Sequence, residues 1–322
     1  MVDDLLSWGL ASGKVIAVYS SVLDTIVRRT INLIFARYPD LSLDAFTWLS
    51  LGSNGRREAV LSSDIDSAVA FADTCDASDI DRYRAGFAEI QRELAAAGFG
   101  GDTHGATASR PAFSRTNAEW RAAAREWMDK PEHNQGAMMT SLLVDGRPIH
   151  GDPGLPEVLK VFSDLRRHPG TMRLLLEASL SARPKSRPLL ARLGRSDTIN
   201  LKKDALLPIV NTARWAALAV GSSALSTTER LDAAAGSAML PDEQAHNLID
   251  VFTVLQRLRL RYQLIQHQRG ETPADVISRD WMSPIDRSVV AEAVREIAAV
   301  QRRMDNVAAY LPADAWTAPA PS

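Results

Sequence analysis

The chain has 322 residues, 46% of them hydrophobic, which provides enough apolar material for one large domain or two ordinary ones. Its formal net charge of −2 and its pI near 6.3 argue against nucleic acid as a partner, because proteins that hold a phosphate backbone usually carry a marked basic excess. The single cysteine, Cys75, cannot form an internal disulfide, and a chain of this size without disulfides fits a reducing compartment.

The N-terminal sequence MVDDLLSWGLASGK begins with two acidic residues, where a secretory signal would carry positive charge, and it lacks a cleavage pattern of small residues. The longest apolar stretch, ALLPIVNTARWAALAVG, is interrupted by Asn211 and Arg214 before it could cross a bilayer. We therefore expect a cytoplasmic protein that is neither exported nor inserted in a membrane.

The first predicted element is an amphipathic helix over residues 15–37, because apolar residues recur there at three- and four-residue spacing. They are Val18, Val22, Ile26, Ile31, Ile34 and Phe35. From residue 46 the pattern changes to two short, β-prone apolar runs, FTWLSL and IDSAVAF, on either side of a turn rich in glycine and arginine. We expect these runs to form neighbouring strands.

Two further helices are predicted next. Residues 79–97 are rich in Ala, Leu, Glu and Arg and place apolar side chains on one side, and glycines follow. The second helix carries Trp120 and Trp127 and ends before Pro131.

The segment MMTSLLVDGRPIHGD, residues 138–152, combines a short apolar run with a turn. We expect a buried strand from Leu142 to about Asp145, although the end of a helix fits so short a run equally well.

From about residue 157 the pattern is helical and no further strand is predicted, so we place a domain boundary between Asp152 and Val161. The clearest helix covers residues 244–268, whose apolar residues follow the spacing of one helix face. The sequence SPID predicts the start of the last helix, with Ser283 as N-cap and Pro284 at the first helical position. A helical bundle is the expected product.

Asp64 and Asp66 stand two residues apart, so on a strand both carboxylates would project from the same face, roughly 6 to 7 Å apart at the backbone. Two like charges so placed favour a bound cation, and hard oxygen ligands suit Mg²⁺ or Mn²⁺. A pair of such ions can hold the entering and leaving oxygens of a phosphoryl displacement. We expect both aspartates to be metal ligands.

The preceding sequence GSNGRR has the properties of a phosphate site. Gly52 permits close approach of the backbone, Ser53 offers a hydroxyl, and a helix that starts there would direct free N–H groups at an anion. Arg56 or Arg57 could add charge-assisted bonds to a triphosphate, and Glu58 is expected to anchor the turn through one of these arginines. The predicted nucleotide-binding residues are Gly52, Ser53, Gly55, Arg56 and Arg57.

The order of strand, Gly-Ser turn, short helix and Asp-x-Asp strand resembles the DNA polymerase β nucleotidyltransferase superfamily. GSNGRREAVLSSDIDSAV is similar to the branch that contains PII uridylyltransferase. It is more similar still to a nucleotidyltransferase family named only as a domain of unknown function, which in longer relatives follows cyclic-nucleotide-binding and CBS modules. WRAAAREWMDKPEHNQGAMMTSLLVDGRPIHGD, INLKKDALLPIVNTARWAALAVG, STTERLDAA and LRLRYQLIQHQRGETPADVI resemble that family's later blocks. The resemblance covers about residues 15 to 305.

The resemblance implies an α+β fold, with a small mixed sheet flanked by helices and followed by an all-α helical bundle. The expected parts are an N-terminal helical segment over residues 1–44, a nucleotidyltransferase domain over 45–155, a helical domain over 156–310 and a disordered tail over 311–322. The tail is rich in proline and alanine.

The superfamily usually adds a third acid from a later strand, and the resemblance implies Asp145 in LLVDGRP, with Asp152 or Asp102 as alternatives. This carboxylate would act as general base toward an acceptor hydroxyl or complete the metal site. The chain departs from the family pattern at Arg110-Pro111, where we expect asparagine before the proline and a cysteine ahead of it. Acceptor recognition near that loop therefore stays open.

The function implied by the resemblance is transfer of a nucleoside monophosphate from an NTP to an acceptor hydroxyl, with Mg²⁺ or Mn²⁺ as cofactor and release of pyrophosphate. By similarity to the PII-modifying enzyme, the acceptor is expected to be a protein, and the transfer uridylylation or adenylylation. Two alternatives stay open. One is a nucleotide-binding regulatory module that no longer transfers, and the other is transfer to a small molecule such as an antibiotic. The sequence predicts neither the base nor the oligomeric state.

Overall fold

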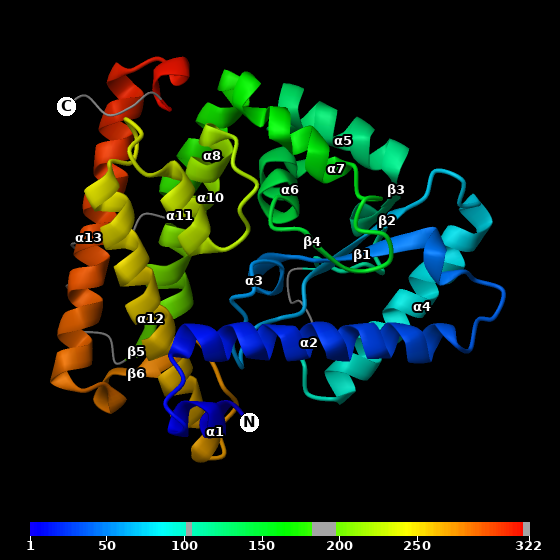
Figure 1. Ribbon diagram of the computed structural model, residues 1–322, viewed down its shortest axis with the longest axis horizontal. Helices are drawn as coiled ribbons and strands as arrows, with labels where there is room; N and C mark the ends of the chain where they lie inside the picture. The colour runs from blue at the N-terminus through cyan, green and yellow to red at the C-terminus, as the bar shows by residue number, and fades with distance from the viewer. Residues whose placement is uncertain (101–104, 182–197, 318–322) are drawn as a thin grey trace. The chain divides into compact units, whose positions relative to one another are not determined.

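The computed structural model describes residues 1–100, 105–181 and 198–317 (Figure 1). The chain divides into two compact units. One contains Lys14–Phe162, and the other contains Asp3–Gly13 together with the described residues of Ser163–Ser322. The fold is of the α+β class, as predicted, with a small mixed sheet in the first unit and mainly helices in the second.

The unit Lys14–Phe162 contains a four-stranded sheet with the order β3-β2-β1-β4. Strand β1 is antiparallel to both β2 and β4, whereas β2 is parallel to β3. The strands are β1 (Phe46–Ser50), β2 (Ser67–Phe71), β3 (Ser114–Thr116) and β4 (Arg147–His150). The helices are α2 (Ser12–Phe35), α3 (Gly52–Gly55), α4 (Ala77–Ala96), α5 (Asn117–Asp129), α6 (Gly136–Leu143) and α7 (Val158–Val161).

Helices cover both faces of this sheet. In Figure 1, α2 and α4 lie on one side of it, and α5, α6 and α7 lie on the other. Every residue of β1 and β2 is buried, which explains why both strands are nearly continuous apolar runs. The core beneath α2 and α4 is rich in aromatic rings, and Phe46 of β1 contacts both Tyr83 and Phe87 of α4. The sheet therefore gives a rigid base for the loops that follow its strands.

The helix predicted over residues 15–37 is confirmed as α2, but only the second half of its predicted apolar face, Ile31, Ile34 and Phe35, is buried. Val18 is 40% exposed, and Val22 and Ile26 are half-buried. The residues that α2 buries are Val15, Ile16, Ser20, Leu23, Asp24, Val27, Ile31, Ile34 and Phe35. Two apolar stripes run along this helix, and spacing alone did not indicate which of them meets the sheet.

The strand predicted from Leu142 to Asp145 does not form. The apolar run instead belongs to α6, which buries Met139 and Leu143 one turn apart, and strand β4 begins only at Arg147. This outcome is the helix end that the sequence left open, because the run from Leu142 to Asp145 is too short for its periodicity to separate a strand from a helix end. The helices predicted over residues 79–97 and around Trp120 are confirmed as α4 and α5.

The second unit is mainly helical. Its helices are α1 (Val2–Ser7), α8 (Pro169–Ser181), α10 (Leu207–Val220), α11 (Thr227–Ala234), α12 (Asp242–Gln268) and α13 (Pro284–Tyr310). Helix α13 begins as predicted, since the Ser283 hydroxyl accepts a hydrogen bond of 3.0 Å from the backbone N–H of Asp286. The long predicted helix over residues 244–268 is confirmed as α12.

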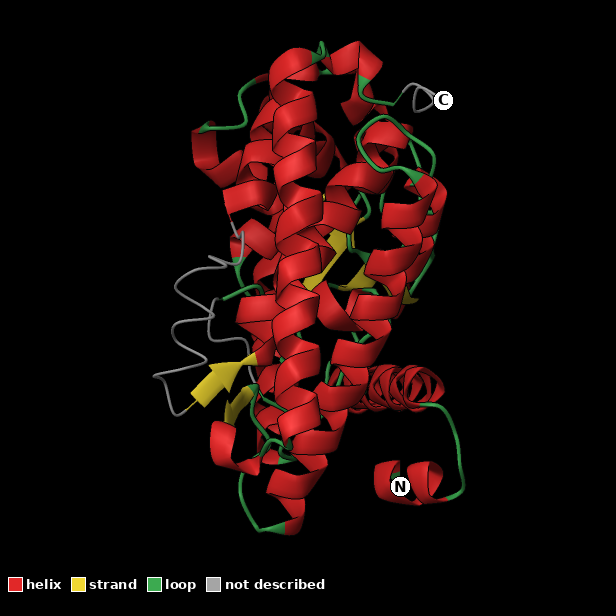
Figure 2. Ribbon diagram, turned by 90° about the vertical axis from the view of Figure 1, so that its left-hand side faces the viewer, coloured by secondary structure: helices red, strands yellow, loops and turns green. Residues whose placement is uncertain are grey.

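The helical part also contains two short strands that were not predicted from the sequence. Strand β5 (Thr198–Asn200) pairs antiparallel with β6 (Val276–Ser278), and Figure 2 shows them as a small sheet of their own. The turn before β6 is held by Asp275, whose carboxylate accepts bonds from the buried Arg259 (2.6 Å) and from Gln263 (2.9 Å) of α12. Runs of three residues are too short to show strand periodicity.

The first part of the predicted tail, residues 311–317, is described by the structure. A disordered tail was expected from residue 311, but residues 313–315 form a 3₁₀ turn and the Trp316 ring is only 2% exposed. This ring lies 5.7 Å from the ring of Trp215, and its indole N–H donates to the Leu311 carbonyl. A large aromatic side chain can order a proline-rich segment by burying its own area. Residues 318–322 lie outside the described part of the chain.

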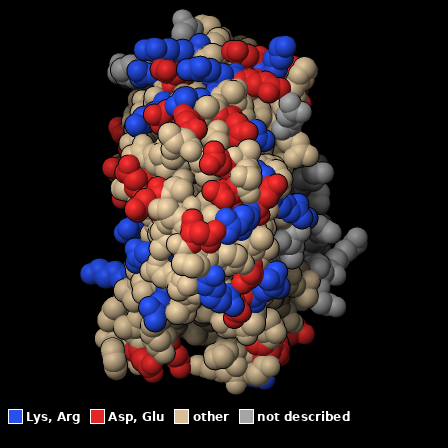
Figure 3. All heavy atoms as spheres, turned by 90° about the vertical axis from the view of Figure 1, so that its right-hand side faces the viewer, with Lys and Arg blue, Asp and Glu red and all other residues tan. Residues whose placement is uncertain are grey.

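Among the helices that the structure describes, none has both the length and the apolar composition needed to cross a lipid bilayer. Figure 3 shows that on one face of the molecule the Lys and Arg side chains are interspersed with Asp and Glu. This mixing agrees with the small net charge of the whole chain.

Candidate functional site

The predicted phosphate turn follows directly on β1. Gly52 has a φ of +56°, in the left-handed region that favours glycine, and it starts the single helical turn α3. Gly52 and Ser53 are half-buried, and as the first residues of a helical turn their N–H groups have no acceptor within that turn. A Cβ on Gly52 would overlap the carboxylate of Asp66. The structure thus brings Asp66 against the turn.

Asp64 and Asp66 lie in an extended segment before β2 and not on a strand, which corrects the prediction. The segment still continues the sheet, because the Leu51 N–H donates a bond of 3.0 Å to the Asp66 carbonyl. Ile65 is buried, whereas both aspartates are half-buried. Ile65 belongs to the core, the Asp66 carboxylate lies by Gly52, and the Asp64 carboxylate lies by Gly100. That both carboxylates share one side stays a prediction.

The sequence Ser-Asp-Ile-Asp occurs twice in this unit, and only one copy has the extended geometry. Residues 63–66 form the copy beside the turn, and residues 78–81 form the copy in α4. Two residues along a helix turn a side chain by about 200°, so Asp79 and Asp81 point in different directions. Both bind arginines of their own helix, Arg82 and Arg84. The second copy therefore has the same four residues in a helical geometry, and variants of it can serve as controls for variants of the first copy.

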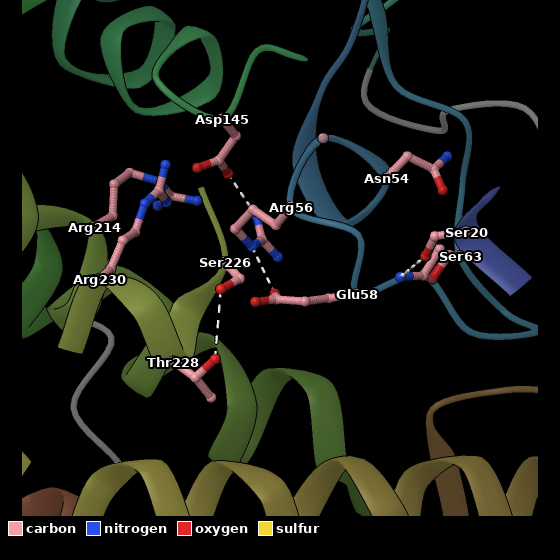
Figure 4. Close-up of polar contacts among 12 residues, drawn as sticks. Ser20, Asn54, Arg56, Glu58, Ser63, Asp145, Arg214, Ser226, Thr228 and Arg230 are labelled. Carbon is pink, nitrogen blue, oxygen red and sulfur yellow. Dashed lines mark hydrogen bonds and ion pairs between the residues drawn. The ribbon is translucent and has the colours of Figure 1, made fainter. Parts of the chain in front are cut away.

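A buried ionic cluster lies beneath the turn. Arg56 is 7% exposed, and its guanidinium bonds to the carboxylates of Glu58 at 2.7 Å and Asp145 at 2.5 Å. Figure 4 shows Arg56 between the two acids. Burial lowers the pKa of Arg56, but attraction by Asp145 and Glu58 outweighs this and raises its pKa above the ordinary value. The expected anchoring of the turn by Glu58 is confirmed.

Two of the predicted site residues, Arg56 and Asp145, bind each other in this buried cluster. Asp145 is fully buried and its carboxylate is bound to Arg56, so the structure does not place it in one cluster with Asp64 and Asp66. Among the described residues, no group of three or more acidic, histidine or cysteine side chains is arranged to hold a metal ion. Arg56 is likewise occupied by protein carboxylates, whereas Arg57 is exposed, with a φ of +59°.

The alternative third acids also lie elsewhere. Asp152 is exposed, and its side chain accepts a bond of 2.8 Å from the Gly154 N–H in the loop after β4. Its carbonyl accepts a bond of 2.7 Å from the Thr47 hydroxyl, so this residue fixes the loop. Asp102 lies outside the described residues.

Two further charged residues hold the turn and were missed by the sequence analysis. Arg147 at the start of β4 donates to the carbonyls of Asn54 (2.9 Å) and Gly55 (3.0 Å), and it forms an ion pair with Asp24 of α2 (2.8 Å). Asp24 stands within the buried stripe of α2. An acid among apolar residues at helical spacing is unusual. The position of Asp24 could therefore have indicated a buried ion pair from the sequence.

Gly55 is required by the same packing. A Cβ on this residue would lie 2.8 Å from the carbonyl oxygen of Ser50 and closer still to that of Asp145. Backbone atoms cannot give way as a flexible side chain can, so glycine alone fits here. The turn therefore packs closely on residues 145–147, through the backbone carbonyl of Asp145 and the side chain of Arg147.

Asp64 and Asp66 suit a divalent ion even without a third protein carboxylate. Mg²⁺ is commonly bound by one or two carboxylates together with substrate phosphates and water, and not by a complete protein cage. The turn beside Asp66 offers the N–H groups of a phosphate site. The donor set of these residues therefore fits an ion that arrives with a nucleotide.

A mixed sheet whose first strand leads into a Gly-Ser turn beside an Asp-x-Asp segment is what we expected of a nucleotidyltransferase core. Residues 1–134 match the family model described as "Putative nucleotidyltransferase DUF294". Residues 169–307 match the one described as "Putative nucleotidyltransferase substrate binding domain". These two stretches are therefore similar to the two domains of a nucleotidyltransferase family. No match to a curated protein was found.

The two matches leave residues 135–168 uncovered. That interval contains Asp145, which pairs with Arg56, and Arg147, which donates to the Asn54 carbonyl. The contacts of residues 135–168 with the turn are therefore known from the structure and not from the family models. The specific relation to PII uridylyltransferase stays a prediction.

Proposed function

We propose that this protein transfers a nucleoside monophosphate from an NTP to an acceptor hydroxyl, and that the unit Lys14–Phe162 is the catalytic unit. The contact of Asp66 with Gly52 is the observation that carries the proposal, because it joins the acidic pair to the glycine-serine turn. The match of residues 1–134 to a nucleotidyltransferase family supports the same class of reaction.

In this reaction the acceptor oxygen attacks the α-phosphorus of the NTP, the bond from that phosphorus to the bridging oxygen breaks, and pyrophosphate leaves. The N–H groups of Gly52 and Ser53 would bind the terminal phosphates, with Arg57 at the exposed edge of the turn. Asp64 and Asp66 would hold Mg²⁺ or Mn²⁺, which when bound neutralises phosphate charge. The chain thereby orients the nucleotide for an in-line displacement.

The acceptor proton needs a base, and Asp145 is our prediction for that role. In the described geometry its carboxylate accepts a hydrogen bond from Arg56 and is fully buried. Asp145 can therefore act as base only if this contact opens when substrates bind. A pH profile that loses its lower limb in Asp145→Asn would support the role.

We propose a protein as the acceptor. The match of residues 169–307 to a domain described as substrate binding supports a dedicated acceptor domain. A domain of about 140 residues is large compared with a small molecule, and it offers surface for a macromolecule.

The test is label transfer from each α-labelled NTP, with Mg²⁺ or Mn²⁺, to fractionated cell extract. The double variant Asp64→Asn, Asp66→Asn should lose transfer by at least about a hundredfold, because both proposed metal ligands lose their charge. The matched control is Asp79→Asn, Asp81→Asn, which alters the same tetrapeptide in α4 and should keep full transfer. Equal transfer by the two double variants would refute the assigned roles.

A regulatory module that binds nucleotide without transfer is the second candidate. The ion pair of Asp145 with Arg56 favours it, because the predicted third acid is engaged by a protein cation. Metal-dependent binding of an NTP by the purified protein, without transfer to any extract fraction, would establish this candidate in place of the first.

A further inference from the structure

The guanidinium of Arg147 links three parts of the unit Lys14–Phe162. It pairs with both carboxylate oxygens of Asp24, at 2.8 and 3.0 Å, and donates to the carbonyls of Asn54 and Gly55. The side chains of Arg147 and Asp24 are 12% and 8% exposed. A planar guanidinium with several donors in fixed directions can make these bonds at once, whereas a lysine ammonium cannot.

Helix α2 supplies a second polar contact one turn earlier. Ser20 is fully buried, and its hydroxyl accepts a bond of 3.2 Å from the backbone N–H of Ala59. Ser20 and Asp24 stand four residues apart, so they share one face of α2. Together they tie this helix to the segment that starts in the turn and ends before the acidic pair.

The acceptors of Arg147 lie at the end of the turn. Asn54 and Gly55 are the last two residues of α3. The Asn54 carbonyl also accepts a bond of 3.1 Å from the Arg57 N–H, so Arg147 adds a second donor there. The N–H groups of Gly52 and Ser53, at the beginning of the turn, are the proposed phosphate donors. A bond that fixes the last carbonyls therefore also sets the direction of the first N–H groups, since the turn has only four residues.

We propose that Arg147, held in place by Asp24, is a positioning residue that keeps the Gly52–Gly55 turn in the conformation that binds nucleotide phosphates. The inference rests on the proposed function. Through Asp24, helix α2 would then contribute to nucleotide binding, although this helix precedes the sheet and carries none of the predicted site residues. Arg147 acts through the backbone of the turn and contacts no nucleotide in this role.

The experiment compares Arg147→Lys with Arg84→Lys in the full-length chain. Arg84 is a close match, because it donates to the hydroxyl and carbonyl of Ser114 and pairs with Asp81, at a distance from the turn. Both variants keep a positive charge and lose the fork of donors. Binding of each NTP with Mg²⁺ is measured by calorimetry, and amide hydrogen exchange of residues 52–57 is measured without nucleotide.

Arg147→Lys should weaken NTP binding about tenfold or more and speed exchange in residues 52–57, because two bonds to the turn are lost. Where transfer is measurable, KM for the NTP should rise more than kcat falls. Asp24→Asn should act in the same direction more weakly, because the amide oxygen keeps one hydrogen bond to Arg147. Arg84→Lys should change neither binding nor exchange at the turn.

The outcomes separate the two proposals. If wild-type protein binds no NTP, the proposed function fails and this inference fails with it. If wild-type protein binds an NTP and Arg147→Lys binds it equally well, or binds it less well without faster exchange at the turn, only the positioning role is overturned. A variant that unfolds is recognised by its circular dichroism, and Asp24→Asn then decides the question by the same two measurements.

Discussion

Replacing Arg56 by methionine tests whether the buried cluster beneath the turn is the structural element that we describe. The side chain is 8% exposed and binds two carboxylates, at 2.7 and 2.5 Å. Methionine fills much of the same volume but leaves Glu58 and Asp145 without their shared counter-charge in a buried place. Removing one partner of a buried ion pair costs about 3–5 kcal/mol, because the remaining charge is desolvated and uncompensated.

This loss should be visible as a large drop in melting temperature. The unit Lys14–Phe162 has about 150 residues, and for such a size 1 kcal/mol shifts Tm by about 2–4 °C. We therefore expect Arg56→Met to unfold about 6–20 °C below wild type in a thermal scan followed by circular dichroism. The control is Arg57→Met, the exposed neighbour, which should lose less than about 2 °C.

A second variant separates lost charge pairing from lost packing. Adding Glu58→Gln and Asp145→Asn to Arg56→Met removes both uncompensated charges, and it should recover part of the lost melting temperature. If Arg56→Met is no less stable than Arg57→Met, the cluster does not hold the turn, and our account of it is wrong. If the triple variant is less stable than Arg56→Met, packing and not charge is the cause.

Three other predictions follow from the structure. Burial, together with Arg28, lowers the pKa of His150, so as the pH falls the unfolded chain binds this proton before the folded chain does. The free energy of unfolding should therefore be full above pH 6.5 and decrease below it, by at most about 1.4 kcal/mol per pH unit. Urea unfolding at several pH values should show a smaller slope for His150→Phe. Trp316→Ala should cost about 3–5 kcal/mol in urea unfolding, whereas Trp8→Ala, at a ring 75% exposed, should cost little. Ser226→Ala removes the hydroxyl that caps α11 and should cost about 1 kcal/mol in the same assay.

The long elements of the fold could be predicted from the sequence because each repeats its signal over many residues. Helices α4 and α12 carry several turns of apolar spacing, and α13 adds a serine cap with a proline after it. The short strands β5 and β6 carry no such repetition, and their pairing depends on a contact between distant parts of the chain. Local pattern cannot report a contact of that kind.

The candidate site divides in the same way. The glycines and acids of residues 52–66 could be selected as candidates because their chemistry follows from residue type at short spacing, and their roles stay predictions. The pairing of Arg56 with Asp145 spans 89 residues and the ion pair of Asp24 with Arg147 spans 123. Nothing in the local sequence indicates which acid a buried arginine will meet, so the pairing of Asp145 with Arg56 was missed. The role that family resemblance gives Asp145 stays a prediction.

The distribution of charge around the turn suggests a division of roles. Arg56 and Arg147 are paired with buried acids. Such pairs add little net stability over apolar packing, and we expect these two to fix the conformation of the turn. Asp64 and Asp66 are half-buried, and the Asp66 carboxylate lies against Gly52, the first residue of the turn. An incoming phosphate would therefore meet a backbone whose shape is already fixed by charges that it does not touch. In such an arrangement Arg147→Lys should affect binding more than stability, and Arg56→Met should affect stability first.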